Sequence, residues 1–186
     1  MTDILMQQVL TIEERIKSVI RDVPDFPKPG ILFRDITPIL RDPGLCREIE
    51  KEFVKIASNF PVDAVVGIES RGFLFGMGLA QRLNVPFIPV RKKGKLPYKT
   101  VSFEYDLEYG SATIEMHTDA ITEGMNILIH DDLLATGGTA AATAELVKMQ
   151  KANVSCFAFL VELSFLNGKK LLEKYDSKII SLANYN

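Results

Sequence analysis

The chain has 186 residues, of which 47% are hydrophobic and 25% are charged, and its formal net charge is −2 at pH 7. This small charge argues against a general nucleic-acid binder, two cysteines form no disulfide framework, and no run reaches the roughly 18 apolar residues of a membrane span. From the length we expect one domain, 1–186. Residues 1–10 lack the basic start of a signal peptide, so we expect the protein in the cytoplasm. We expect no nucleic-acid or membrane partner.

Two helices and a proline-rich arm are predicted at the N-terminal end. The sequence Thr-Ile-Glu-Glu at 11–14 is a capping box and predicts the start of a helix. The segment 24–38 is rich in proline, which ends that helix and favours an extended arm. Asp-Pro at 42–43 predicts the cap and first residue of the second helix. We interpret residues 1–40, approximately, as a small hood and 41–186 as the core.

Strands and helices alternate through the rest of the chain. Apolar and β-branched runs predict strands at 62–66, 87–90, 111–117, 127–131, 154–163 and 178–183. One helix is predicted to end at 83 and another to cover 140–151. Such an alternation is typical of an α/β fold with a parallel sheet flanked by helices.

The most informative stretch is 127–140, where an apolar strand is followed by Asp131, Asp132 and Thr-Gly-Gly-Thr at 136–139. Two glycines let the backbone turn sharply, and the start of a helix carries roughly +0.5 of a charge, so this turn is suited to phosphate. Two carboxylates would repel phosphate. We therefore expect them to serve vicinal ribose hydroxyls or a magnesium-bound water, and the stretch predicts a site for a ribose phosphate.

Residues 131–139 resemble the phosphoribosyl pyrophosphate (PRPP) motif of type I phosphoribosyltransferases, and most closely that of the adenine-specific members. The alternative is an ordinary strand-turn-helix with glycine at the turn. The resemblance implies that Asp131 and Asp132 are catalytic, binding the ribose hydroxyls and stabilising charge at C1′. It also implies that one continuous loop binds the 5′-phosphate. Its residues are Leu134, Ala135, Thr136, Gly137, Gly138 and Thr139.

Two cationic segments follow predicted strands. The first contains Arg71, and an arginine can hold phosphate through two parallel hydrogen bonds; the alternative is a surface side chain. The second puts four cations into 91–95, for which the alternative is a solvated turn. The resemblance implies that both bind pyrophosphate, with a cis peptide at Glu69–Ser70 and with Arg91 reaching the partner subunit of a homodimer. The pyrophosphate-binding residues would be Glu69, Ser70, Arg71, Arg91, Lys92 and Lys95.

The segment 100–110 contains three acids and two tyrosines and is predicted to be a polar loop. It resembles the family's mobile catalytic loop, which implies that Glu108 moves the purine proton and that Tyr109 belongs to the lid. The alternative is an exposed loop whose acids keep the protein soluble.

The arm at 24–35 resembles the family's adenine-binding hood. The resemblance implies that Phe33 and Leu133 sandwich the purine, while backbone groups of Leu32 and Arg34 read its edge. The alternative is that Phe33 is a plain core residue.

The resemblance extends from about 16 to 182. It implies a type I phosphoribosyltransferase-like parallel sheet with a hood and a mobile loop, acting on adenine and PRPP. Mg²⁺ would be bound through substrate and water near the two acids, with no direct protein ligand. Two alternatives stay open: transfer to another purine base, and a regulator that senses PRPP without catalysis. His130 stands where the family usually has an aliphatic residue, and it receives no role.

Overall fold

The computed structural model describes residues 10–106 and 110–186. Within these ranges, seven strands form one sheet in the order β5-β6-β4-β3-β7-β8-β9. The neighbouring strands β4, β3, β7, β8 and β9 all pair in parallel. At the other side of the sheet, β6 pairs antiparallel with both β4 and β5. The strands are β3 (Ala64–Ile68), β4 (Phe87–Lys92), β5 (Thr100–Asp106), β6 (Ser111–His117), β7 (Asn126–Leu134), β8 (Asn153–Leu163) and β9 (Lys178–Tyr185).

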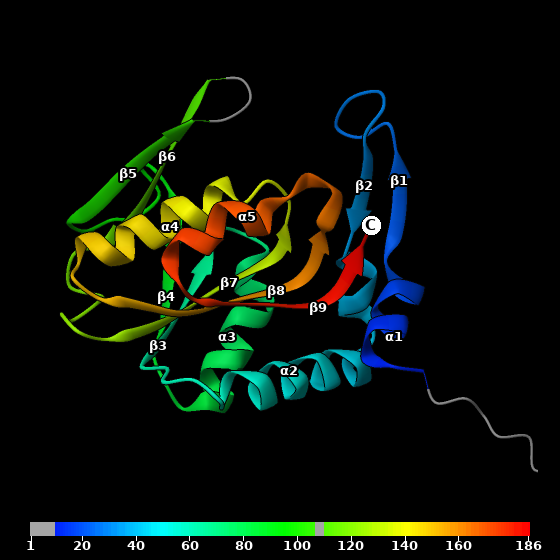
Figure 1. Ribbon diagram of the computed structural model, residues 1–186, viewed down its shortest axis with the longest axis horizontal. Helices are drawn as coiled ribbons and strands as arrows, with labels where there is room; N and C mark the ends of the chain where they lie inside the picture. The colour runs from blue at the N-terminus through cyan, green and yellow to red at the C-terminus, as the bar shows by residue number, and fades with distance from the viewer. Residues whose placement is uncertain (1–9, 107–109) are drawn as a thin grey trace, which may run out of the picture.

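Helices cover both faces of the sheet (Figure 1). On one face lie α2 (Pro43–Ala57) and α3 (Gly72–Leu83), and on the other lie α4 (Gly138–Met149) and α5 (Gly168–Leu172). The described residues also include three short 3-10 helices, η1 (Thr37–Arg41), η2 (Ser164–Leu166) and η3 (Glu173–Tyr175).

The central strands β3, β7 and β8 are largely apolar because the sheet is buried on both faces there. Successive side chains of a strand point to opposite faces, so Leu128 joins the cluster under α2 and α3, while Ile129 joins the cluster under α4. Both side chains are fully buried. The predicted α/β class is confirmed. None of the helices within the described ranges is long and apolar enough to span a membrane.

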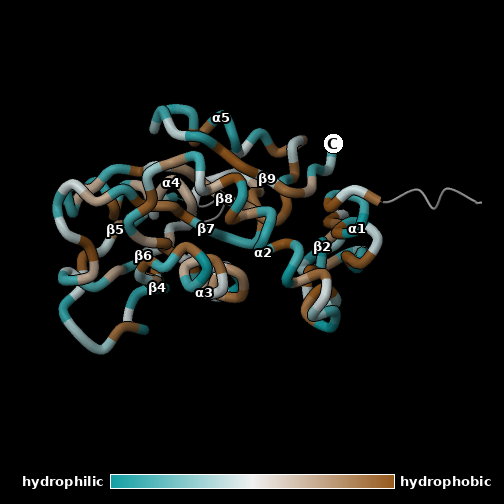
Figure 2. The backbone as a smooth tube through the Cα atoms, turned by 90° about the horizontal axis from the view of Figure 1, so that it is seen from below, coloured by the Kyte–Doolittle hydropathy of each residue, from teal (hydrophilic) through white to brown (hydrophobic). Residues whose placement is uncertain are grey.

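The N-terminal hood consists of α1 (Ile12–Val19) and a separate two-stranded antiparallel sheet, β1 (Arg21–Pro24) and β2 (Leu32–Asp35). The predicted capping box at 11–14 is present. The end of β9 attaches to the hood, since the backbone N–H of Asn184 donates to Glu13 over 3.0 Å. Figure 2 shows α1 and β2 beside the main sheet, on the side of β9.

The prediction of a polar loop over 100–110 is wrong for its first seven residues, which form β5. They pair with β6 in a register that puts Phe103 opposite Ile114. Apolar or aromatic side chains at 101, 103 and 105 alternate with polar ones at 102, 104 and 106, and the first set packs against the core. This two-residue period signals a strand, but the acids concealed it. The sheet is consequently mixed rather than purely parallel.

Candidate functional site

The turn between β7 and α4 is held by a close backbone contact. Gly137 has φ +83°, and a Cβ there would lie 2.7 Å from the carbonyl oxygen of Gly168. A Cβ on Gly168 would in turn lie 2.2 Å from the carbonyl oxygen of Ala135. Glycine is therefore needed on both sides. We did not anticipate a role for Gly168 from the sequence, although Asn-Gly at 167–168 is a turn signal.

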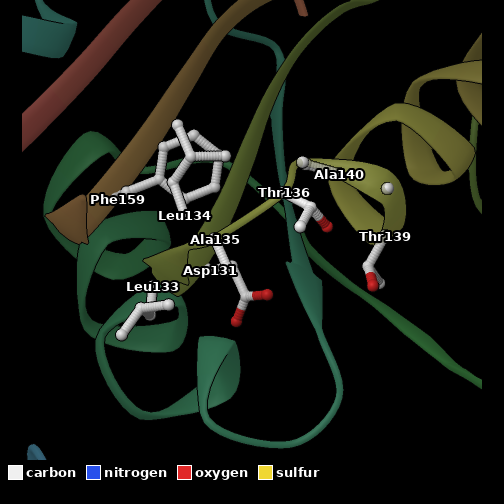
Figure 3. Close-up of a pocket in the computed structure, with 10 residues that line it drawn as sticks. Asp131, Leu133, Leu134, Ala135, Thr136, Thr139, Ala140 and Phe159 are labelled. Carbon is white, nitrogen blue, oxygen red and sulfur yellow. The ribbon is translucent and has the colours of Figure 1, made fainter. Parts of the chain in front are cut away.

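The predicted phosphate-binding residues surround one cavity of about 80 Å³, here called the loop cavity. The first N–H groups of α4 have no partner within the helix, and they carry its positive dipole end. Figure 3 shows the carboxylate of Asp131 and the hydroxyls of Thr136 and Thr139 on one side of the loop, with Leu134 and Phe159 on the other. The lining residues are Asp131, Leu133, Leu134, Ala135, Thr136, Gly137, Gly138, Thr139, Ala140 and Phe159.

A second cavity of about 130 Å³, the basic cavity, lies against the first. Both cavities share Asp131 and Thr139. Arg91 and Lys92 line the basic cavity together with Glu69. These two cations belong to the end of β4 and not to a loop, so the strand itself presents them beside the phosphate-binding turn.

Glu69 orders this end of β4. Its carboxylate accepts hydrogen bonds from the Arg91 guanidinium at 3.3 and 3.4 Å and from the backbone N–H of Lys92 at 3.0 Å. These bonds outweigh the effect of burial and lower the pKa of Glu69. Lys95 takes part through its backbone, because its carbonyl oxygen accepts from Arg91 at 3.2 Å. Glu69 and Ser70 are joined by a cis peptide, as the resemblance implies.

The two acids sit inside β7, which runs three residues further than predicted. Asp132 is 2% exposed, and its Oδ2 lies 2.9 Å from Nε of Arg71. Asp131 lines both cavities, and its Oδ1 accepts from the backbone N–H of Asp132 at 2.8 Å. Burial, followed by the Asp132 carboxylate, raises the pKa of Asp131 well above its usual range. Burial also raises the pKa of Asp132, against the opposing effect of Arg71.

Arg71 connects the hood to this acid pair. Besides its ion pair with Asp132, its guanidinium carbon lies 5.2 Å from the ring centroid of Phe33. Phe33 also meets Phe26 edge-to-face at 5.1 Å. Arg71 is absent from the linings of the two cavities, so the structure places it between the acid pair and the hood.

The other residues predicted to contact the base are divided between hood and core. Leu32 is 45% exposed and pairs with Pro24 in the hood hairpin. Arg34 forms an ion pair with Asp22 and stacks over the Tyr185 ring at 4.1 Å. Leu133 lines the loop cavity in the core. The predicted loop residues Glu108 and Tyr109 lie outside the described residues.

Tyr105 is a site residue that the sequence interpretation missed. Its hydroxyl lies 3.0 Å from that of Thr139, and it lines the basic cavity. The alternation within β5 is the signal that would have placed it on the inner face.

His130 is a buried core residue. It is 0% exposed, and its ring meets that of Phe53 edge-to-face at 5.2 Å. Burial lowers its pKa to about 4, so the ring is neutral at pH 7.

Comparison with known proteins gives one consistent result. The model of the phosphoribosyl transferase domain matches residues 36–185. An adenine phosphoribosyltransferase of Cytophaga hutchinsonii is 53% identical over 174 residues, which cover 94% of this chain and 96% of that protein.

Two solved structures have the same fold. The adenine phosphoribosyltransferase of Thermoanaerobacter pseudethanolicus superposes with a TM-score of 0.90 at 48% identity, covering 94% of this chain and 100% of the other. That of Saccharomyces cerevisiae, solved with adenine and an imino-altritol bisphosphate, has a TM-score of 0.86 at 43% identity. The coverage there is 92% of this chain and 98% of the other.

Proposed function

The chain belongs to the phosphoribosyl transferase family, among its adenine phosphoribosyltransferases, and we propose on this premise how its residues carry out the reaction. The enzyme transfers the 5-phosphoribosyl group of PRPP to adenine, giving AMP and pyrophosphate. The observation that carries the proposal is the meeting of the loop cavity and the basic cavity at Asp131 and Thr139. PRPP needs two anion sites with a sugar between them, and this pair of cavities offers that arrangement.

The 5′-phosphate would occupy the loop cavity. Backbone N–H groups at the start of α4 and the hydroxyls of Thr136 and Thr139 are its donors. The backbone of Leu134 to Gly138 shapes the cradle, and Gly137 permits its turn. These donors all come from one continuous loop, which brings them together at the cavity.

Asp131 and Asp132 would act on the ribose. N9 of adenine bonds to C1′ as the bond from C1′ to the pyrophosphate oxygen breaks, so positive charge builds on the sugar. Ionised carboxylates beside the sugar stabilise that charge. Asp131 lines both cavities and is the acid closer to the substrate in this proposal. Asp132 would act together with Arg71, its ion-pair partner.

The departing pyrophosphate would bind at the basic cavity. Arg91 and Lys92 supply positive charge there, while Glu69, Ser70 and Lys95 shape the surrounding backbone. Arg71 is assigned to pyrophosphate by resemblance. This role requires its guanidinium to turn from the pair with Asp132 toward the ligand.

Adenine would lie between the hood and the core. Phe33 and Leu133 are the proposed faces of its binding slot, and backbone groups of Leu32 and Arg34 would read the edge of the base. The contact of Arg71 with both Phe33 and Asp132 supports this position, since it brings the hood to the acid pair. Glu108 is proposed to accept the purine proton, with Tyr109 beside it in the loop.

Mg²⁺ is proposed as the cofactor. Among residues 10–106 and 110–186, no group of three or more His, Cys, Asp or Glu side chains is arranged to hold a metal ion. The ion would bind through substrate oxygens and water beside Asp131 and Asp132. When bound, Mg²⁺ supplies positive charge that stabilises the leaving pyrophosphate.

A homodimer is part of the proposal: Arg91 lines the basic cavity of its own chain, and from this end of β4 its guanidinium would also extend to pyrophosphate in the neighbouring site. Exposed apolar side chains on α3, Leu74 at 44% and Met77 at 47%, offer a surface that a second copy would cover. We further propose one catalytic domain, with residues 1–40 approximately as its hood. A cytoplasmic location is proposed too, since Cys46 and Cys156 are both free thiols, as expected in a reducing compartment.

The test of function is a comparison of bases. The protein is mixed with PRPP and magnesium, and formation of AMP, IMP, GMP and UMP is measured side by side from adenine, hypoxanthine, guanine and uracil. We expect AMP to dominate. Equal or greater turnover of another base would contradict adenine specificity, and binding of PRPP without any product would favour a regulator.

A further inference from the structure

Glu115 is a buried acid on β6 with an unusual set of partners. It is 5% exposed, and its Oε1 accepts from three consecutive backbone N–H groups, those of Gly94, Lys95 and Leu96, at 3.0, 3.1 and 3.1 Å. Its Oε2 accepts from the hydroxyl of Thr100 at 3.3 Å. A buried carboxylate is costly unless hydrogen bonds satisfy it, and here four donors do so.

These donors belong to the segment that follows the basic cavity. We call residues 92–96 the basic turn. Gly94 has φ +83°, which lets the chain reverse so that three N–H groups face one oxygen. The carbonyl oxygen of Lys95 accepts from the Arg91 guanidinium at 3.2 Å. The position of Arg91 therefore depends on the position of the basic turn.

Two acids hold the basic turn from opposite ends. Glu69 binds Arg91 and the backbone N–H of Lys92 at its start, and Glu115 binds the backbone of 94–96 at its end. Glu69 lines the basic cavity, whereas Glu115 does not. Glu115 therefore does not contact an anion in this cavity, and we expect it to act through the turn.

We propose that Glu115 is a positioning residue for pyrophosphate, holding the basic turn so that Arg91 and Lys92 stay at the cavity. This inference rests on the proposed role of that cavity. Its carboxylate gives the turn a defined shape without placing a negative charge in the cavity. Without it, three N–H groups would lose their acceptor, and the turn would relax toward water.

The experiment compares Glu115→Ala and Glu115→Gln with wild type in the full chain. Glu115→Ala should raise KM for PRPP about tenfold, because three backbone N–H groups of the basic turn lose their acceptor and the turn no longer holds Arg91 and Lys92 in place, while KM for adenine stays the same. Glu115→Gln keeps one oxygen acceptor, so its KM for PRPP should lie between those of Glu115→Ala and wild type. Glu104→Ala is the matched control, because Glu104 lies exposed on the adjoining strand, where its carboxylate accepts a hydrogen bond from the hydroxyl of Ser111.

A purely structural role would lower the melting temperature and leave both KM values unchanged, and that result overturns the proposal. If Glu115→Ala does not fold, amide exchange of the peptide 92–97 in Glu115→Gln provides the second measurement. Exchange there should accelerate while α4 keeps its protection, and unchanged exchange overturns the proposal. Lys92→Ala tests the role of the basic cavity independently of Glu115. An unchanged KM for PRPP in that variant would refute pyrophosphate binding at this cavity, whatever the Glu115 variants show.

Discussion

The hydroxyl groups of Tyr105 and Thr139 lie 3.0 Å apart, and this contact joins β5 to the first turn of α4. A threonine hydroxyl has one proton and two lone pairs, so Thr139 can accept from Tyr105 while donating to a phosphate. Tyr105→Phe removes this orienting bond. It should raise KM for PRPP roughly two- to tenfold, the range for one hydrogen bond, and leave kcat close to wild type. Tyr98→Phe, at a position 60% exposed, is the control. Identical KM values for both variants and wild type would refute the role of Tyr105.

The acid pair should be essential to catalysis but not to folding. Asp131→Asn and Asp132→Asn keep side-chain shape and remove the charge that favours a positive C1′. Each should lower kcat/KM for PRPP by about a hundredfold or more, the scale for loss of one preorganised electrostatic group. Circular dichroism should be unchanged. Wild-type kinetics in the double variant would show that the motif does not act as proposed.

Asp131→Asn should also stabilise the substrate-free protein at neutral pH. Burial and the Asp132 carboxylate raise the pKa of Asp131 in the folded state, so the fold favours the protonated acid. The stability that this acid contributes is fully present below its unfolded pKa of about 3.9. It is lost as the pH rises through the folded pKa. Asp131→Asn avoids that loss. Its melting temperature should exceed that of wild type at pH 7.

This advantage should shrink as the pH falls toward 4, because the wild-type acid then begins to be protonated in the unfolded state as well. Asp119→Asn, at an exposed acid in the turn after β6, is the control and should change the melting temperature little at either pH. An advantage that is constant with pH would show that the ionisation of Asp131 is not its source.

Arg91 can be tested by mixing two inactive variants. Arg91→Ala and Asp131→Asn subunits are allowed to exchange, and a mixed dimer then holds one site with Asp131 from one chain and Arg91 from the other. If Arg91 acts on the neighbouring site, about a quarter of wild-type activity should return at equal mixing, since half the dimers are mixed and each has one complete site. Failure to recover after proven exchange would assign Arg91 to its own chain, where it already lines a cavity with Asp131.

Glu108 should carry the purine proton. Glu108→Gln keeps shape and hydrogen-bonding reach but cannot accept a proton as the N9–C1′ bond forms. It should lower kcat by about 10² to 10⁴ and change KM for PRPP little, because the phosphate cradle is elsewhere. Glu104→Gln is the control, since Glu104 accepts from Ser111 at 2.6 Å. If Glu108→Gln turns over like wild type, another group accepts the proton.

Local features of the site were predictable because they lie in continuous stretches of sequence. The phosphate-binding turn, its glycines and the acid pair occupy 131–139, and a strand followed by a helix was enough to place them at one edge of a sheet. The helix starts at 12 and 43 likewise follow from their capping residues. In β5 the local signal was present, but its two acids, Glu104 and Asp106, concealed it.

The sequence by itself therefore determined the α/β class, the resemblance, and the loop that would bind a ribose phosphate. Only the tertiary structure decided which distant side chains support that loop. Tyr105 meets Thr139 across 34 positions, Arg71 pairs with Asp132, and Glu115 holds the basic turn 19 to 21 positions away. No local pattern encodes these contacts. They follow from the order in which β6, β4, β3 and β7 pair, and from the burial that makes each polar group find a partner in a neighbouring element.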